Sequence, residues 1–233
     1  MSLFTTADLH LSLGSSKPMD IFKGWENSQQ RIKKNWNETV KSEDTVVIIG
    51  DVSWAMKLSD AILDFTFIND LNGNKIIIKG NHDYWWTTVK KMEEFLCQNN
   101  LSTIKILNNN CYEVGKFFIA GSRGWFYDAP KEDEKTLLRE AGRIRASIES
   151  AEKMNTENEQ QKEIIVFLHY PPIYNNYECE EILNVLLEKN IKTCYYGHIH
   201  GEGAKWALNS QKHGINFKLV SCDTTNFTPI IIL

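Results

Sequence analysis

The sequence predicts an α/β fold in which two mixed β-sheets lie between layers of helices. Segments typical of strands and of helices alternate along most of the 233 residues, which is the pattern of layered α/β proteins. Several strand segments, including 45–49 and 164–168, are apolar on consecutive residues, so both of their faces should be buried. Strands also follow one another directly around 112–120 and near the C-terminus, which favours two sheets over one doubly wound sheet.

Each strand candidate is a short run rich in β-branched and aromatic residues. The candidates are residues 3–7, 45–49, 75–79, 105–107, 112–114, 117–120, 164–168, 192–196, 217–221 and 229–233. The helix candidates, with apolar residues at helical spacing, are residues 25–41, 59–71, 87–99 and 179–189. Ile32, Trp36 and Val40 form one apolar stripe in the first helix, and Ser59 and Thr87 are the expected N-caps of the next two.

Residues 131–162 form the most charged part of the chain. Apolar residues recur there at helical spacing, namely Leu137, Leu138, Ala141, Ile144 and Ile148. We therefore expect a charged helical insertion within a single domain that spans residues 1–233, since no linker-like stretch divides the chain. Such an insertion could cap an active site or cover a sheet edge, and we favour the second interpretation.

Charge and hydropathy exclude several classes of protein. The formal net charge is −4, and a long nucleic acid is an improbable partner because binding to its phosphate backbone needs clustered Lys and Arg. The longest apolar runs fall far short of the ~20 residues of a membrane helix, so no membrane partner is expected. The N-terminal residues lack the pattern of a secretory signal, which predicts a cytoplasmic location.

Polar residues cluster in short groups at the end of predicted strands, or directly after them. The groups are Asp8-x-His10, Gly50-Asp51, Gly80-Asn81-His82-Asp83, His169 and Gly197-His198-Ile199-His200-Gly201. Ligands of α/β sheets bind beyond the carboxyl ends of the strands, so we expect these groups to converge on one rim. Carboxylates, imidazoles and an amide form a nitrogen and oxygen donor set that suits Mn, Fe or Zn.

Most of these groups, taken alone, have a structural alternative. Gly50-Asp51 and Gly80-Asn81 are common turn sequences, and His169 before two prolines could be a hydrogen-bonded core residue. The pair His198 and His200 between glycines is more specific to a metal. All the groups occur together, each after a strand, and this conjunction favours a metal site.

In this order the groups resemble the motifs of the calcineurin-like metallophosphoesterases, from the first strand to Gly201. The resemblance implies a four-layer αββα sandwich and a site for two divalent or trivalent metal ions. It assigns one metal to Asp8, His10, Asp51 and His200, and the other to Asp51, Asn81, His169 and His198, with Asp51 as the bridge. It makes His82 a residue that binds no metal and that hydrogen-bonds the phosphoryl group or the leaving group.

The resemblance implies a di-metal phosphoric ester hydrolase. Two metal ions lower the pKa of a shared water and stabilise charge at phosphorus, and His82, next to Asn81, can act as general acid. We expect a phosphomonoesterase or phosphodiesterase for a small phosphorylated substrate, a nucleotide being one candidate. A nuclease of the same fold is the alternative, disfavoured by the acidic charge, and a non-catalytic metal-binding scaffold is disfavoured because every ligand is present.

The chain departs from the protein serine/threonine phosphatases of this family. Those enzymes have Asp-Arg where Trp54 and Ala55 stand here, which argues against a protein phosphatase and leaves open what orients His82. Asp223 is one candidate for that role, and Asp83 is not assigned to it. Arg123, between glycines after a strand, is the predicted phosphate ligand, with an exposed loop arginine as the alternative. The physiological substrate, native metals and oligomeric state stay open.

Overall fold

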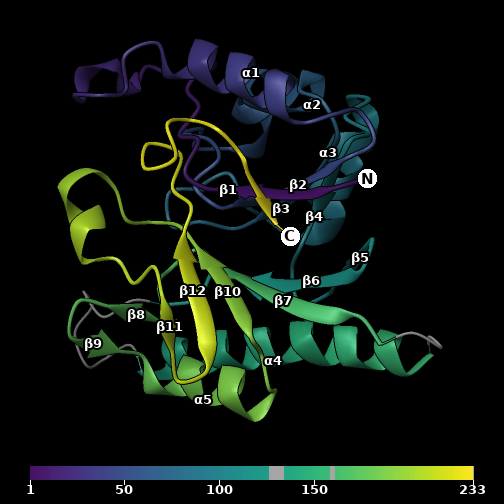
Figure 1. The fold of residues 1–233 in the computed structure, drawn as a ribbon. Coiled ribbons are helices and arrows are strands. Elements are labelled where there is room, and N and C mark those ends of the chain that lie inside the picture. The colour runs from purple at the N-terminus through teal and green to yellow at the C-terminus, as the bar shows by residue number, and fades with distance from the viewer. Residues whose placement is uncertain (126–133, 158–160, 233) are drawn as a thin grey trace.

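The computed structural model describes residues 1–125, 134–157 and 161–232, and it has four layers (Figure 1). Helices α1, α2 and α3 cover one face of the first sheet, and α4 and α5 cover the opposite face of the second sheet. The bounds are α1 Ser28–Thr39, α2 Ile62–Asp70, α3 Val89–Gln98, α4 Glu134–Glu157 and α5 Glu180–Glu188. The predicted αββα sandwich is confirmed.

Both sheets are mixed, as predicted. The first has the order β13-β1-β2-β3-β4, with β1 to β4 parallel and β13 antiparallel at the edge. Its strands are β1 Leu3–Thr6, β2 Thr45–Ile49, β3 Asn74–Ile78, β4 Ile104–Ile106 and β13 Ile230–Ile232. The second sheet has the order β11-β12-β10-β7-β6-β5, with antiparallel strands at both edges. Its strands are β5 Tyr112–Val114, β6 Phe117–Ser122, β7 Glu163–Leu168, β10 Thr193–Tyr196, β11 Gln211–Lys212 and β12 Ile215–Leu219.

The apolar runs reflect burial on both faces of each strand. In β2, Val46 and Ile48 pack with the helices of the first layer, and Val47 and Ile49 pack against the second sheet. This alternation follows from the two-residue period of a strand. A polar residue at any of these positions would meet apolar neighbours, so the run is continuous.

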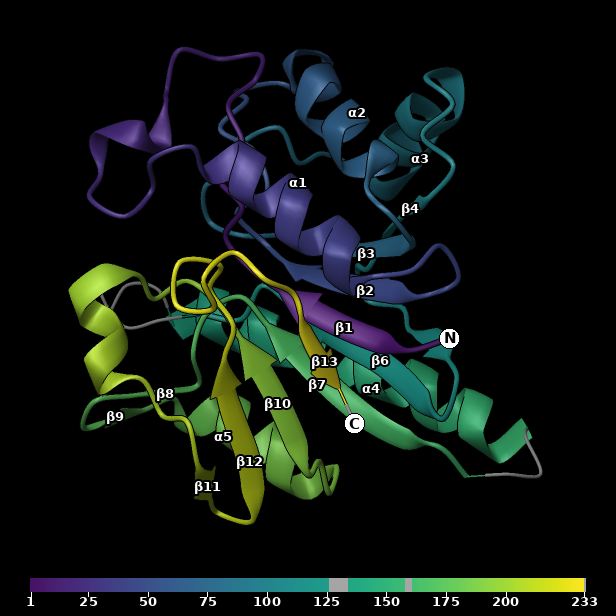
Figure 2. The same ribbon diagram turned by 45° about the horizontal axis from the view of Figure 1, so that its top comes forward.

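Helix α4 lies within the charged segment and forms the crossover between the parallel strands β6 and β7 (Figure 2). It packs along the outer face of the second sheet, with Leu137, Ala141, Ile144 and Ile148 buried as their spacing predicts, whereas Leu138 is exposed. The helix covers a face, so the interpretation as a cover for a sheet edge is wrong. Residues 131–133 and 158–160 of the predicted insertion lie outside the described residues.

Short elements and helix starts differ from the sequence predictions. The cap of α3 is Thr88, whose Oγ1 accepts from the N–H of Lys91 at 3.4 Å, and not Thr87. Ser59 lies in the 3₁₀ helix η2 (Leu58–Ala61) that precedes α2. The hairpin of β8 (Ile173–Tyr174) and β9 (Tyr177–Glu178), strand β11, and the 3₁₀ helices η1 (Met19–Ile21) and η4 (Gly201–Trp206) were not predicted. Such pieces are too short to show a periodic pattern.

The two sheets meet at the carboxyl ends of their strands. Just beyond β1, the N–H of Ala7 donates to Val220 O and the N–H of Cys222 donates to Ala7 O, both at 3.0 Å. These bonds join the loop after β1, in the first sheet, to the segment after β12, in the second sheet. Within the described part of the chain, no helix is both long enough and apolar enough to span a membrane.

Candidate metal centre

The loops that follow the strands hold non-glycine residues in left-handed backbone conformations. The φ angles are 61° at Asp8, 45° at His10, 49° at Asp51 and 71° at His198. Each such residue costs of order 1–3 kcal/mol and persists only where its surroundings fix it. Backbone hydrogen bonds fix two of them, because the N–H of Asp8 donates to Gly50 O at 3.0 Å and that of His10 donates to Asp51 O at 2.9 Å.

Two glycines allow the loops to approach one another closely. A Cβ at Gly80 would lie 2.1 Å from Oδ1 of Asp51, and one at Gly197 would lie 2.7 Å from Oδ2 of Asp8. Both glycines are therefore required by the positions of the two carboxylates. This is the physical reason for glycine in the Gly-Asn-His-Asp and Gly-His-x-His groups.

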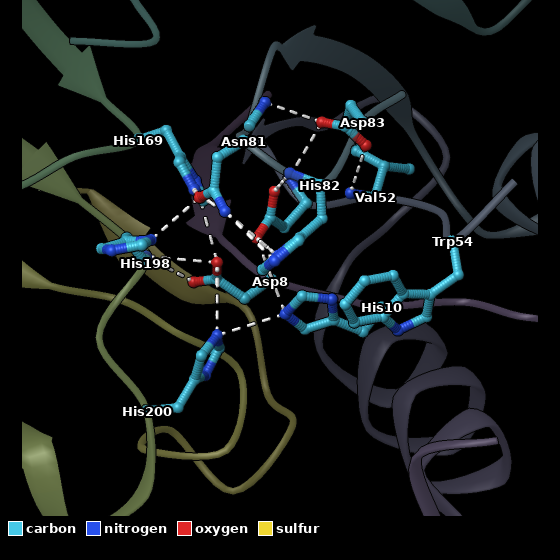
Figure 3. Close-up of polar contacts among 12 residues, drawn as sticks. Asp8, His10, Val52, Trp54, Asn81, His82, Asp83, His169, His198 and His200 are labelled. Atoms are coloured by element: carbon cyan, nitrogen blue, oxygen red, sulfur yellow. Dashed lines mark hydrogen bonds and ion pairs between the residues drawn. The ribbon is translucent and has the colours of Figure 1, made fainter. Parts of the chain in front are cut away.

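All seven predicted metal ligands come together in the structure (Figure 3). One group contains Asp8, His10 and His200. The Nε2 atoms of His10 and His200 lie 3.2 Å apart, and Nε2 of His200 lies 3.5 Å from Oδ1 of Asp8. Oδ2 of Asp51 is 3.8 Å from Nε2 of His10, so Asp51 borders this group.

Asp51 also borders a second group formed by Asn81, His169 and His198. Oδ1 of Asn81 lies 2.7 Å from Nε2 of His169 and 2.9 Å from Nδ1 of His198. Oδ2 of Asp51 is 3.5 Å from Nε2 of His169. The same carboxylate oxygen thus faces both groups.

The two carboxylates of the centre are buried, and neither forms an ion pair with a lysine or arginine of the described residues. The side chains of Asp8 and Asp51 are 0% and 1% exposed, and within the described ranges their ion-pair partners are all imidazoles. Burial acts to raise the pKa of each carboxyl, but His200 beside Asp8 and His169 beside Asp51 hold both pKa values below their usual range. Buried carboxylates normally require a cation or dense hydrogen bonding, and a metal ion fits this need.

The imidazoles suit metal binding. Burial lowers the pKa of His10 and of His198 to about 4 each, so both are neutral near pH 7. Burial also acts to lower the pKa of His200, but the carboxylates of Asp8 and Asp223 raise it to about 10. A neutral imidazole binds a metal directly, whereas a protonated one must first release its proton.

Hydrogen bonds from groups behind the ligands hold two of the four ligand imidazoles in place. Nδ1 of His169 is 3.0 Å from Ile49 O, and Nδ1 of His200 is 3.2 Å from Oδ1 of Asp223. Such bonds to the second ring nitrogen are usual for metal-binding histidines. His10 is held differently, by stacking on Trp54 at a centroid distance of 4.9 Å.

Asp83 and Asp223 support the centre, and sequence reasoning assigned neither role. Oδ2 of Asp83 accepts from the N–H groups of Asp51 and Gly80 at 2.9 and 2.7 Å, and Oδ1 accepts from Val52 at 2.8 Å. Asp83 therefore ties two ligand loops together, and burial with the nearby Asp51 raises its pKa to about 6. The hydrogen bonds of Asp223 go to His200 and Gly201, so the candidate role beside His82 is wrong. The sequence signal for Asp83 was its place in the group Gly80-Asn81-His82-Asp83.

His82 lies at the open side of the centre. Its side chain is 34% exposed, its N–H donates to Oδ1 of Asp51, and its Nδ1 lies 2.8 Å from Oδ2 of the same carboxylate. The ring packs against Trp54 at 4.6 Å. Asp51 and Trp54 thus orient His82, and the aromatic residue that replaces the phosphatase Asp has a supporting role of its own.

Arg123 lies directly after β6. Nη2 of its guanidinium is 3.6 Å from Oε1 of Glu140, and the guanidinium lies over the ring of Trp125 at 4.8 Å. The side chain is 20% exposed, so the alternative of an exposed loop arginine is wrong. Arg123 lines a separate cavity with Lys79 and Arg143.

Solved structures of other proteins share this fold. A protein of unknown function from Aquifex aeolicus matches with a TM-score of 0.51 and 16% identity, over 99% of this chain and 95% of that one. The phosphopantetheinyl hydrolase of Mycobacterium tuberculosis matches with a TM-score of 0.53 and 10% identity, over 100% and 95%. A protein of Thermus thermophilus matches with a TM-score of 0.52 and 12% identity, over 85% and 81%. At these identities the likeness shows the fold alone.

Sequence comparison gives the family. No curated protein matches the chain in sequence. The family model of the calcineurin-like phosphoesterases matches residues 1–202, which include all five polar groups. On this match and the fold, the chain belongs to the calcineurin-like phosphoesterase family.

Proposed function

We propose that this protein hydrolyses a small phosphate ester with two metal ions, held on either side of Asp51. The observation that carries the proposal is the place of the Asp51 carboxylate between two groups of donors. Oδ2 of Asp51 lies 3.8 Å from Nε2 of His10 and 3.5 Å from Nε2 of His169. One carboxylate can therefore serve both sites.

The ligand sets follow from the two groups of donors. Asp8, His10 and His200 would hold one ion, and Asn81, His169 and His198 the other, with Asp51 shared. Mn, Fe and Zn accept such mixtures of imidazole and oxygen ligands better than Mg does. When bound, two such ions activate a water and neutralise charge on the phosphoryl oxygens.

His82 is proposed as the proton donor to the leaving group. Its partial exposure leaves it open to a bound ester, whereas the side chains of Asp8, His10, Asp51 and His169 are buried. Nδ1 of His82 lies 2.8 Å from Oδ2 of Asp51, and Nε2 lies 3.3 Å from Nδ2 of Asn81, so these two residues hold the ring beside the centre. A proton carried at Nε2 can then pass to the departing oxygen, as general acid catalysis requires. Trp54 holds the ring in this orientation.

One solved structure of this fold supports hydrolysis without specifying the ester. The neighbour from Mycobacterium tuberculosis is a phosphopantetheinyl hydrolase. The net charge of −4 disfavours a long nucleic acid as substrate, and no feature of the centre favours the nuclease alternative.

Activity of metal-stripped protein tests the proposal. The panel contains p-nitrophenyl phosphate, bis-p-nitrophenyl phosphate and nucleotides, with Mn, Fe, Zn, Ni or Mg added separately. We expect hydrolysis of at least one ester, faster with Mn or another transition metal than with Mg, and loss of that activity in Asp51→Asn. The matched control is Asp60→Asn, an exposed carboxylate outside the centre. Absence of hydrolysis with every metal would overturn the proposal.

A further inference from the structure

A cavity of about 400 Å³ lies beside the metal centre at the carboxyl ends of β3, β4 and β6. Three cationic side chains line it, and we call it the basic cavity after them: Lys79, Arg123 and Arg143. Polar groups of Thr88, Asn108 and Ser122 also line it. The metal centre is built from carboxylates, imidazoles and an amide, whereas the charged side chains that line this cavity are all cationic.

Residues that line the basic cavity adjoin ligands of the metal centre, although no ligand itself lines the cavity. Lys79 stands two residues before Asn81, a distance along the chain of at most ~7 Å. On the other wall, Ser122 O accepts from the N–H of His169 at 3.4 Å, and Arg123 O accepts from the N–H of Tyr170 at 2.9 Å. The cavity therefore borders the side of the centre that holds Asn81 and His169.

The positive charge of the cavity is only partly neutralised. Glu140, which is 1% exposed, lies 2.5 Å from Nη1 of Arg143 and 3.6 Å from Nη2 of Arg123, and it accepts from Oγ of Ser122 at 2.9 Å. Glu140 thus positions both guanidinium groups with one negative charge. In the part of the chain that the structure describes, the ammonium group of Lys79 has no ion-pair partner, and the buried Nε of Arg123 has no hydrogen-bond partner.

We propose that the basic cavity binds a second phosphoryl group of the substrate, so that the preferred substrate is an ester with two phosphoryl groups. One group would be hydrolysed at the metal centre while Lys79, Arg123 and Arg143 hold the other. This inference rests on the proposed function and assigns a substrate class to the same site. A phosphoryl group carries a charge of about −1.5 to −2 near pH 7, opposite in sign to the three cationic side chains that line the cavity. Guanidinium groups bind phosphate through paired hydrogen bonds.

A series of synthetic esters tests the inference. Each alkane-α,ω-diol bisphosphate, with two to eight carbons, is compared with the monophosphate of the same diol, and phosphate release gives kcat/KM. We expect the bisphosphate to exceed the monophosphate by about tenfold or more at one spacer length, because one charge-assisted hydrogen bond alone contributes that factor. The best spacer length then reports the separation of the basic cavity from the metal centre.

Three variants locate the effect. Lys79→Gln and Arg143→Gln should reduce the ratio of bisphosphate to monophosphate kcat/KM to near one. Arg139→Gln, an exposed arginine on the same helix as Arg143, should keep the ratio of the wild type. Equal kcat/KM for both esters at every spacer length, with the monophosphates hydrolysed, would overturn the inference and leave the proposed function intact.

Phosphate binding to metal-free protein gives a measurement that needs no catalysis. Without metal the centre presents two carboxylates that repel anions, so equilibrium dialysis with radiolabelled inorganic phosphate reports the basic cavity. We expect saturable binding by the wild type, weakened about tenfold in Lys79→Gln and in Arg143→Gln and unchanged in Arg139→Gln. Absence of saturable binding by the wild type would contradict the anion site, whether or not any ester is hydrolysed.

Discussion

Strands β2 and β7 each carry an apolar residue near their carboxyl end that is buried in the core. Two residues further along the chain, just beyond each strand, lies a polar residue that is equally buried. Ile49 and Phe167 are 0% exposed, and Asp51 and His169 are 1% and 0% exposed. Burial of Ile49 contributes about 1.5–3 kcal/mol to stability. Burial of the Asp51 carboxylate costs several kcal/mol unless partners compensate for it.

The interior between the sheets and the rim, formed by the loops at the carboxyl ends of the strands, therefore differ in how well the buried residues match their local preferences. In the interior, local pattern, packing and burial all agree. At the rim, left-handed residues, buried carboxylates and crowded imidazoles each conflict with local preference. Such conflicts concentrate at functional sites. The predictions that follow disturb either the rim or the interior and compare the results.

The largest expected effect is on catalysis at the rim. His82→Ala should lower kcat by roughly 10²–10⁴-fold for an alkyl phosphate, the usual range for the loss of a general acid. The loss should be smaller for p-nitrophenyl phosphate, whose leaving group needs little protonation. Metal content by elemental analysis should equal that of the wild type. An equal loss for both esters would remove the assignment of His82 as proton donor.

A change in the interior should affect stability and spare the centre. Ile49→Ala removes a fully buried side chain two residues before Asp51 and should lower the free energy of unfolding by about 2–5 kcal/mol. Denaturant titration measures this loss. The metal content and KM should stay at their wild-type values, and a loss of metal in this variant would show that interior and rim are not separable.

Metal removal should disturb the rim and leave the interior unchanged, which is the reverse of the effect of Ile49→Ala. Its ligands come from distant parts of the chain, so the folded state binds metal far better than the unfolded state. At a metal concentration 100–1,000 times Kd, binding adds about 2.7–4.1 kcal/mol, which is about 5–15 °C in Tm for a chain of this size. Chelation should therefore lower Tm by that amount in calorimetry. An unchanged Tm after verified removal would argue against a shared, preformed site.

The smallest effect concerns a buried charge remote from the rim. Lys75 is 0% exposed, and its burial lowers the pKa of its ammonium group to about 8. The ammonium donates to Asn69 O at 3.2 Å and also to Leu71 O at the end of α2. The unfolded state therefore binds more protons than the folded state between the folded pKa and that of a free lysine, so stability rises with pH there. Relative to Lys75→Met, the free energy of unfolding of the wild type should grow by about 1 kcal/mol from pH 8 to pH 9. A constant difference across that range would show that the pKa of Lys75 is not lowered.

The difference between interior and rim also explains how much could be predicted from the sequence. Strands such as 45–49 and 112–114 were predicted with their exact bounds because their residues repeat a simple local pattern. The polar groups after the strands were recognised because glycine, histidine and aspartate recur there in a fixed order. In contrast, Asp223 meets His200, and Arg123 meets Glu140, only through folding. No local sequence pattern predicts a contact between residues that lie far apart along the chain. These partners are therefore known only from the structure.

Metal stoichiometry in single ligand variants tests the central claim, that two donor groups share Asp51. Elemental analysis of protein loaded with Mn and then desalted should give two equivalents per chain for the wild type and for His82→Ala. It should give one equivalent for His198→Ala and one for His200→Ala, because each variant loses a ligand from a different group. One equivalent in the wild type, or loss of an equivalent in His82→Ala, would contradict the two-metal centre with His82 outside it.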